Sequence, residues 1–446
     1  MKRLKEKVLD DVEKENVKFI DLQFTDIHGV IKSVTIPAQQ LENSLDNGTW
    51  FDGSSIKGFA RISESDMYLM PDPETYFKLP WEPKEKGVAR IICDVHSSDG
   101  KPYEGDPRYI LKKTLSDAAK RGFIYNTGPE LEFFLFKTDG ELVTKPVPHD
   151  IGSYFDFSPK DLASDVRNNI ISALHSLGMY VEMSHHEVAF GQHEIDFRYA
   201  DALKTADNAL TFKYAVKAIA HQHGLYATFM PKPVFGMNGS GMHVHQSFFN
   251  KKGKNLFFEK KDEYNLSKIA RGFIAGQLEH MREISAIVAP TVNSYKRLVP
   301  GYEAPIYISW ARRNRSALIR VPSYTPGREQ SVRAELRCPD PSCNPYLAFA
   351  VMLEAGLDGI KRKLEPPQPV EEDVYEFDDT KLKKFYITTL PSSLEEALDE
   401  FERSDLVKKT LGEHTFHEYL KAKKSEWTDY RIQVTDWELK RYLESL

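Results

Sequence analysis

The sequence predicts an α+β fold with a small β-rich N-terminal unit and a larger C-terminal part in which strands and helices mix. Residues 17–37 alternate polar and apolar side chains around a turn at His28-Gly29, a pattern typical of a β-hairpin. The polar, turn-rich segment SSDGKPYEGDPR ends this first unit. Beyond it, the chain lacks the regular strand–helix alternation of a doubly wound sheet. We therefore expect two domains, residues 1–104 and 105–446.

The N-terminal unit is predicted to hold few elements besides the hairpin. The first 19 residues have the charge pattern of an amphipathic surface helix and lack the apolar core of a signal peptide. A short helix is expected at residues 38–47, followed by the Gly/Ser loop FDGSS. After a stretch rich in proline, VARIICDV is expected to form a strand.

The larger part is predicted to begin with a helix from Pro107 to about Arg121. The charged C-terminal segment, residues 404–446, is also helical in pattern. Apolar residues at helical spacing predict five further helices, at 160–178, 200–223, 265–288, 344–361 and 393–402.

Four strand-like segments of the larger part carry polar residues on one face, because side chains two apart on a strand point the same way. Each segment alone could be an edge strand with a solvated face. Their preference for Glu, His and Arg, and their strongly apolar opposite faces, favour instead an interior site lined by a curved sheet. The residues are Glu130 and Glu132 in GPELEFFLF, Glu187 and Glu194 in VEMSHHEVAFGQHEIDF, His243, His245 and Ser247 in NGSGMHVHQSFF, and Arg333, Glu335 and Arg337 in SVRAELRC.

Converging carboxylates require a counter-charge. Two carboxylates about 4 Å apart repel by about 4 kcal/mol at an effective dielectric constant of about 20. Divalent cations remove this repulsion, and carboxylate ligands with some imidazole suit Mg²⁺ or Mn²⁺ better than zinc. The four segments therefore predict a divalent-metal site.

An arginine-rich segment, ARRNRSALIRVP, carries Arg312, Arg313, Arg315 and Arg320. It could be a patch for nucleic acid or an acidic partner. Near a metal site it better fits a phosphate clamp, because guanidinium groups bind phosphate in bidentate fashion. The chain has no P-loop motif, and its glycines near residue 240 lead into a strand rather than a helix, which excludes a Rossmann fingerprint.

Composition narrows the class of protein further. The 446 residues carry a formal net charge of −6, which argues against nucleic acid as the main partner. Three cysteines form no zinc or disulfide pattern and favour a reduced, cytoplasmic location. The longest apolar run, Leu347–Leu353, is far shorter than a membrane span. We expect no membrane association.

Eight motifs follow one another from residue 51 to residue 347: FDGSSIKGF, ESDMYLMPD, GPELEFF, FMPKP, NGSGMHVHQS, NSYKRLVPGYEAP, RRNRSALIR and ELRCPDPSCNPYL. This ordered set resembles class I glutamine synthetase, over nearly the whole chain. The resemblance implies an N-terminal β-grasp-like domain and a catalytic domain whose curved, mostly antiparallel sheet holds an active site between subunits.

By matching motif positions, the resemblance implies two or three Mg²⁺ or Mn²⁺ ions at each active site. The first ion, near glutamate, would be held by Glu132, Glu187 and Glu194, and the second, near the ATP phosphates, by Glu130, His243 and Glu335. Five other histidines are not expected to bind metal. His28, His185 and His186 are expected to pack or to support the ligands without binding metal themselves, and His221 and His223 to interact with the C-terminal end of a helix.

The resemblance also implies roles for the substrate contacts. Glutamate would meet Asn238, Gly239, Arg297, Glu303 and Arg337, and ATP would meet Glu182, His245, Ser247, Arg315, Arg320 and Arg333. Asp52 of a neighbouring subunit would bind and deprotonate ammonium, Glu303 would close the site on a flap, and Arg315 would assist phosphoryl transfer. Arg61 would link the site to feedback by glutamine.

The implied reaction is ATP-dependent ligation of ammonia to the glutamate side chain, through γ-glutamyl phosphate, in a dodecamer of two hexameric rings. A γ-glutamyl ligase of the same fold that uses another amine is the alternative, and a catalytically dead relative is a rival of another class. The segment DVYEFDD around Tyr375 lacks the flanks of an adenylylated tyrosine. This difference, and the absence of an insert, resemble the alpha-type branch, which is controlled by glutamine and by small regulatory proteins.

Overall fold

The computed structural model describes residues 2–54, 56, 66–138, 145–385 and 387–446. In these residues the N-terminal part forms one sheet with strand order β2-β1-β6-β4-β3, and β5 pairs with β6. Strands β1 and β6 run parallel, and the other pairs are antiparallel. The elements are α1 (Lys2–Lys14), β1 (Phe19–Thr25), β2 (Ile31–Pro37), η1 (Ala38–Gln40), α2 (Leu41–Asn47), β3 (Thr49–Asp52), β4 (Asp66–Pro71), η3 (Pro73–Thr75), β5 (Phe77–Lys78), η4 (Lys84–Lys86) and β6 (Val88–Ser97).

A second, larger sheet in the described residues has the order β13-β14-β15-β12-β7-β9-β8, with β10 and β11 also paired to β7. It is mostly antiparallel, and only β13 and β14 run parallel. Its strands are β7 (Ile124–Lys137), β8 (Val181–His186), β9 (Gln192–Phe197), β10 (Ala200–Asp201), β11 (Leu225–Thr228), β12 (Met242–Phe249), β13 (Tyr307–Ala311), β14 (Ala317–Arg320) and β15 (Ala334–Leu336).

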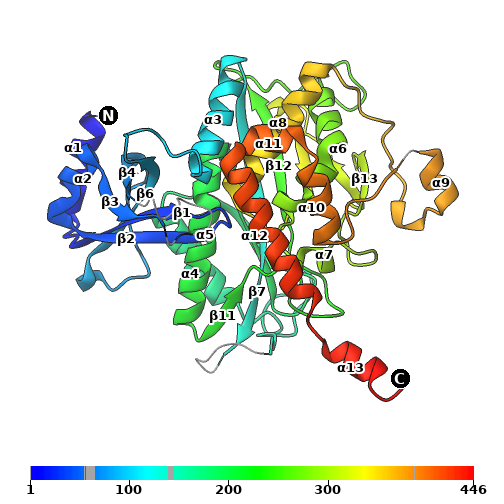
Figure 1. Ribbon diagram of the computed structural model, residues 1–446, viewed down its shortest axis with the longest axis horizontal. Helices are drawn as coiled ribbons and strands as arrows, with labels where there is room; N and C mark the ends of the chain where they lie inside the picture. Colours follow the sequence, from blue (N-terminus) through cyan, green and yellow to red (C-terminus); the bar gives the residue numbers. More distant parts are fainter. Residues whose placement is uncertain (1, 55, 57–65, 139–144, 386) are drawn as a thin grey trace.

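Helices pack against this second sheet, and the last helix, α13, lies apart from the body of the protein (Figure 1). The side chains of this end include the exposed apolar residues Trp437 and Leu443. The helical elements are α3 (Pro107–Lys120), α4 (Ser164–Ser176), α5 (Ala202–Gln222), α6 (Lys268–Val288), α7 (Ser294–Arg297), η5 (Glu329–Ser331), α8 (Pro345–Arg362), η6 (Val374–Glu376), α9 (Asp379–Lys384), α10 (Leu394–Glu402), α11 (Asp405–Leu411), α12 (Glu413–Arg431) and α13 (Asp436–Tyr442).

The predicted α+β class is confirmed, with the hairpin, the helices and the four polar strand segments in the expected places. The segment at 331–338 is shorter than predicted, because the 3-10 turn η5 precedes it and only Ala334–Leu336 pairs. Each sheet has its own apolar core. In the larger core, α6 and α8 meet at Gly276, where an added Cβ would lie 2.2 Å from the carbonyl oxygen of Ala355.

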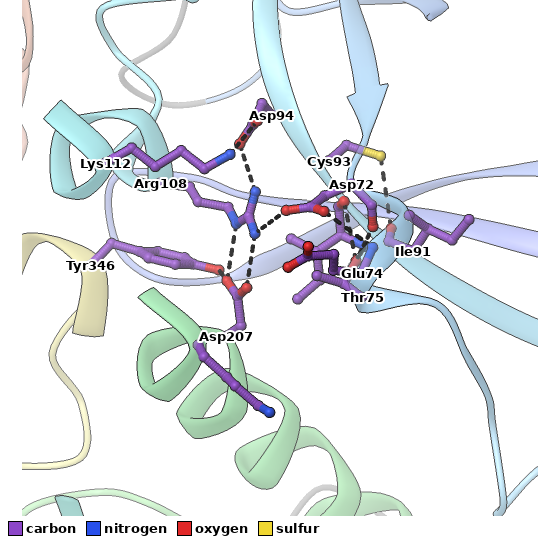
Figure 2. Close-up of polar contacts among 12 residues, drawn as sticks. Asp72, Glu74, Thr75, Ile91, Cys93, Asp94, Arg108, Lys112, Asp207 and Tyr346 are labelled. Atoms are coloured by element: carbon purple, nitrogen blue, oxygen red, sulfur yellow. Dashed lines mark hydrogen bonds and ion pairs between the residues drawn. The ribbon is translucent and has the colours of Figure 1, made fainter. Parts of the chain in front are cut away.

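A buried arginine joins the N-terminal unit to helices of the larger part. Arg108, at the start of α3, pairs with Asp72 (2.7 Å) and Asp94 (2.7 Å) of the N-terminal unit. The same guanidinium donates two hydrogen bonds to Asp207 of α5, at 3.0 and 2.9 Å, and Tyr346 of α8 donates a third to that carboxylate (Figure 2). Arg108 is only 2% exposed, so this ion cluster is part of the packing between the N-terminal unit and the helices.

Candidate active site

The register of the second sheet brings the predicted polar residues into one continuous group. On the central strand β7, Glu130 lies opposite His243 of β12 on one side and Asp196 of β9 on the other. Two residues further along the same face, Glu132 lies opposite Glu194 of β9. Alternation of side chains therefore places all five on the same side of the sheet.

The group continues across both neighbouring strand pairs. His185 of β8 lies opposite Glu194, which extends the group beyond β9. On the other side, Glu335 of β15 lies between His245 of β12 and Arg320 of β14. The apolar residues that alternate with these, such as Leu131 and Phe133, are buried in the main core.

Three carboxylates and a histidine meet at one end of this polar face. The Glu194 carboxylate lies 3.2 Å from His185 Nε2, and the Glu187 carboxylate lies 3.6 Å from His185 Nδ1. Glu132 is held by hydrogen bonds from the Gln192 side chain (2.9 Å) and from the backbone N–H of Gly241 (2.9 Å). The predicted residues Glu132, Glu187 and Glu194 are thus brought together.

Burial and mutual repulsion make this end of the face unfavourable for ionised carboxylates. Burial, and then the charge of Glu187, raise the pKa of Glu132 to about 8. Burial and the neighbouring carboxylates raise the pKa of Glu194 well above its usual value, Asp196 having the largest effect among them. Burial and Glu130 raise the pKa of Asp196 to about 8. A cation bound here would stabilise the ionised forms.

The second group of ligand-type residues is organised by an arginine. Arg333 Nε donates to His245 Nδ1 (3.0 Å), and His245 Nε2 lies 2.6 Å from the Glu130 carboxylate. A guanidinium can only donate, so the proton of neutral His245 sits on Nε2 and points at Glu130. His245 therefore orients Glu130 and has no free lone pair.

His243 differs from His245 in keeping a lone pair that can bind a metal ion. It lies 3.5 Å from Glu130 and 4.0 Å from Glu335, and burial, followed by the charge of Arg337, lowers its pKa to about 4. It is therefore neutral and retains a lone pair for a metal. Glu130, His243 and Glu335 supply two carboxylates and one imidazole, and Glu132, Glu187 and Glu194 supply three carboxylates. Both sets fit a hard divalent cation such as Mg²⁺ or Mn²⁺.

A third cluster has metal-ligand residues but is a hydrogen-bond network. Asp150, His186 and His193 have ligand-type atoms within 4.8 Å of one another and are buried. Arg167 Nη1 donates to His193 Nδ1 (3.0 Å), which leaves the proton of neutral His193 on Nε2. His186 Nε2 lies 2.9 Å from the Asp150 carboxylate. The Asp150 carboxylate also accepts from the Gly191 N–H at 3.0 Å, so this cluster holds the turn between β8 and β9.

The predicted arginines differ in how free their guanidinium groups are. Arg337 makes a short ion pair with Glu335, and Arg320 pairs with the same carboxylate at 3.0 Å. Arg297 is buried and donates to the backbone carbonyls of Cys338 (2.8 Å), Pro339 (3.3 Å) and Arg337 (3.1 Å). Arg315 is exposed and lines the cavity described next.

A cavity of about 840 Å³ lies over the polar face. Its wall includes the loop with Asn238 and Gly239 and the flap residues 301–304, and Asn238 Nδ2 donates to Glu303 Oε2 at 3.4 Å. The predicted site residues that line it are Glu130, Glu132, Glu187, Glu194, Asn238, Gly239, His243, Arg297, Glu303, Arg315, Arg320, Glu335 and Arg337.

Five predicted residues lie outside this cavity. Asp52 is exposed at the end of β3 and accepts a hydrogen bond from the Ser54 N–H at 2.8 Å. Glu182 is exposed on β8, and Ser247 is buried on β12. His245 contacts the cavity residue Glu130, and Arg333 contacts His245 in turn. Arg61, the proposed regulatory residue, falls outside the described residues.

The cavity also contains residues that the sequence analysis did not assign. Asp196 and His185 each lie two positions from a predicted ligand, so the same alternation could have identified them. His185, expected to pack or to support the ligands indirectly, contacts Glu187 and Glu194 directly. Tyr154 comes from a loop and Tyr375 from the 3-10 turn η6; both line the wall, and no spacing pattern in the sequence indicates them.

Among the helices of the described residues, none combines the length and apolar character that a membrane span needs.

Comparison with known proteins agrees with this geometry. Residues 104–442 match the family described as "Glutamine synthetase, catalytic domain", and residues 16–98 match "Glutamine synthetase, beta-Grasp domain". The chain is 55% identical to a glutamine synthetase of Methanosarcina mazei, with 99% of this chain and 98% of the relative covered. It is 52% identical to one of Thermus thermophilus, with 98% of each covered.

Among solved structures, the chain is similar to one described as a GmaS/ADP complex, with a TM-score of 0.89 and 34% identity over 98% of this chain and 99% of that one. The ordered motifs, the two-sheet fold and the matches over nearly the full length of both chains agree. The chain belongs to the glutamine synthetase family.

Proposed function

We propose that the chain joins ammonia to the side-chain carboxylate of L-glutamate at the expense of ATP, giving L-glutamine, ADP and phosphate through γ-glutamyl phosphate. The observation that carries this proposal is the polar face of the second sheet, where carboxylates, imidazoles and arginines line one cavity beside an acidic flap. Its residues match what transfer of a phosphoryl group to a carboxylate requires, which is positioning and charge stabilisation.

Two or three divalent cations, Mg²⁺ or Mn²⁺, complete the proposed site. Glu132, Glu187 and Glu194 would hold the first, and Glu130, His243 and Glu335 the second. When bound, the cations would neutralise charge on the phosphoryl group that moves from ATP to glutamate.

The arginines and the nucleotide contacts serve the two substrates. Arg337 and Arg297, with Asn238 and Gly239, would bind glutamate, and the Arg337 fork suits a carboxylate because guanidinium can donate two parallel hydrogen bonds. ATP would be bound by Glu182, His245, Ser247, Arg315, Arg320 and Arg333, with Arg315 also stabilising the transferred phosphoryl group.

Glu303 is assigned to the second half of the reaction. γ-Glutamyl phosphate reacts readily with water, so the cavity must exclude water while ammonia enters. An acidic side chain on the flap attracts ammonium and can take its proton. Asp52 is exposed and lies outside the cavity of its own chain, an arrangement that suits a role in a neighbour's site.

We therefore propose a homo-oligomer, a dodecamer of two hexameric rings with active sites between adjacent subunits. The exposed apolar side chains of α13 and the residues after it offer a surface for contact between subunits. We place the chain in the alpha-type branch, controlled by glutamine and by small regulatory proteins, and in the cytoplasm.

One steady-state assay tests the function. Purified protein is given glutamate, ATP and Mg²⁺ with ammonium or with a panel of primary amines, and phosphate and the γ-glutamyl product are both measured. We expect the highest kcat/KM with ammonium. A higher value with a primary amine would support the alternative γ-glutamyl ligase, and absence of any ATP-dependent product would support a catalytically dead relative.

The flap provides a second test. Replacing Glu303 with Ala should uncouple the reaction, because the flap could no longer hold ammonium beside the acyl phosphate. Phosphate release should then exceed glutamine formation. Retained one-to-one stoichiometry with unchanged dependence on ammonium would make Glu303 an ordinary loop residue.

A further inference from the structure

Residues 370–376, here called the strap, contribute Glu371, Asp373 and Tyr375 to the wall of the cavity. The strap follows helix α8 and is anchored by a small apolar cluster in which Val370 and Val374 are buried. At its start, the Val370 N–H donates to the carbonyl oxygen of Trp310 at 2.9 Å. This contact places the strap directly beside the loop that carries the phosphate-clamp arginines.

Several hydrogen bonds hold that arginine loop, residues 312–316, against the strap. The Glu371 carboxylate accepts from the backbone N–H groups of Arg312 (2.8 Å) and Arg313 (3.0 Å). The Asn314 side chain donates to the carbonyl oxygens of Val370 (3.1 Å) and Glu372 (2.5 Å). The strap thus fixes the backbone of Arg312 and Arg313 and the side chain of Asn314, immediately before Arg315.

The far end of the strap reaches the flap through one side chain. The Tyr375 hydroxyl donates a hydrogen bond of 2.5 Å to the carbonyl oxygen of Ala304. Burial, and then the charge of Asp373, raise the pKa of Tyr375 to about 12, so the hydroxyl stays protonated and remains a donor.

Ala304 is buried and directly follows Glu303, whose backbone has φ 58°, in the left-handed region. A residue other than glycine costs energy in this conformation and needs support from its surroundings. The bond to Ala304 is such a support. It fixes the Ala304–Pro305 peptide plane, one residue after Glu303, while the Glu303 carboxylate lies near Asn238 on the cavity side.

We propose that Tyr375 is a positioning residue for Glu303, and that the strap makes the position of the flap depend on the arginine loop. This inference rests on the proposed function of Glu303. Through the strap, an ordered arginine loop at the ATP end holds the flap in place at the ammonia end. Formation of γ-glutamyl phosphate and shielding of that intermediate are thereby coupled through one short segment.

Loss of this support has a defined chemical consequence. With the flap displaced, water adds its oxygen to the acyl carbon of γ-glutamyl phosphate in place of ammonia. The bond between that carbon and the phosphate oxygen breaks and glutamate is regenerated. One proton of the water leaves with hydrogen phosphate, and the other passes to solvent. ATP is then consumed without glutamine.

The test is Tyr375→Phe, which removes one hydroxyl and keeps the ring. Tyr307→Phe is the matched control, because the Tyr307 ring lies 6.0 Å from that of Tyr375, and its hydroxyl has no hydrogen bond within the described part of the chain. Loss of one hydrogen bond shifts an equilibrium by roughly two- to tenfold. We expect a rise of that size in the KM for ammonium, and more phosphate than glutamine at low ammonium, while the KM for ATP stays near the wild-type value.

Hydrogen exchange gives a readout independent of turnover. In Tyr375→Phe, the backbone amides of residues 301–304 should exchange faster, and those of Tyr307→Phe should match the wild type. The proposal is overturned if exchange of the flap is unchanged, if it rises with no change in coupling, or if the control shows the same effects. If the wild type forms no glutamine at all, the proposed function fails, and exchange alone decides whether Tyr375 holds the flap.

Discussion

The ion cluster around Arg108 makes a sharp prediction about stability. Replacing Arg108 with Met keeps much of the volume and removes the charge shared by Asp72, Asp94 and Asp207. Breaking a buried ion pair by removing one partner costs about 3–5 kcal/mol, because the remaining charge is left without compensation. Since a domain is stable by only about 5–15 kcal/mol, the variant should lose a large part of the free energy of unfolding.

The assay is urea unfolding at fixed protein concentration, followed by tryptophan fluorescence and circular dichroism. Lys112→Met is the matched control. Lys112 also pairs with Asp94 (2.5 Å), but its side chain is 31% exposed, and a partly solvated pair of this kind contributes less than about 1 kcal/mol. The Arg108 variant should therefore be destabilised several times more than the Lys112 variant.

The pH dependence of the stability loss shows whether the loss comes from the missing charge of Arg108 or from altered packing. Without Arg108, protonation of the buried carboxylates removes the uncompensated charge in the folded state, so the folded variant should bind more protons than the folded wild type. The difference in stability between the two proteins should then shrink as the pH falls from 7 to 5. A loss of less than about 1 kcal/mol, or a larger loss that does not change with pH, would refute the electrostatic account of this cluster.

Three other predictions concern the proposed site. Glu187→Gln should lower turnover at least tenfold, a loss of about 1.4 kcal/mol in transition-state stabilisation, while the circular dichroism spectrum is kept; near-normal turnover at saturating Mg²⁺ would contradict its role as a ligand. Arg337→Lys keeps the charge but loses the fork, so the KM for glutamate should rise, and a selective rise in the KM for ATP would assign it to the other substrate. Arg61→Ala should weaken glutamine inhibition by roughly tenfold if the coupling is about 1.4 kcal/mol, with catalysis nearly kept; superimposable inhibition curves would make Arg61 an ordinary surface residue.

Local patterns in the sequence predicted much of the fold. The alternation in GPELEFFLF requires that Glu130 and Glu132 share a face, and the structure has this face opposite a buried apolar one. The hairpin around Gly29 pairs as expected, with β1 and β2 in antiparallel register. These features depend on residues close together in the chain, where spacing alone decides which side a residue takes.

Long-range partners could not be predicted in this way. Which strands flank β7, and in what register, depends on packing between segments far apart in the chain, such as those that carry Ile124 and Phe249. No local spacing in the sequence indicates these partners. The pairing of Arg108 with Asp207 and the bond from Tyr375 to the backbone of Ala304 are of the same kind. Every residue has a backbone carbonyl oxygen, so the amino-acid type of Ala304 gives no sign that it accepts this bond. The sequence therefore predicts no contact for Tyr375 and distinguishes it only by its flanking residues.

The position of the site follows from the two faces of one sheet. One face of β7 packs Leu131 and Phe133 into the main core, and this packing sets the strand register. The same register forces Glu130 and Glu132 onto the opposite face, beside Glu194 and His243. A slip of one residue would turn the apolar side chains into the cavity, so the free energy of the core maintains an arrangement of like charges that would not assemble by itself. Packing on the apolar face thus fixes the positions of the acidic residues on the other face. The arginines and the proposed cations then need only balance the charges of these residues.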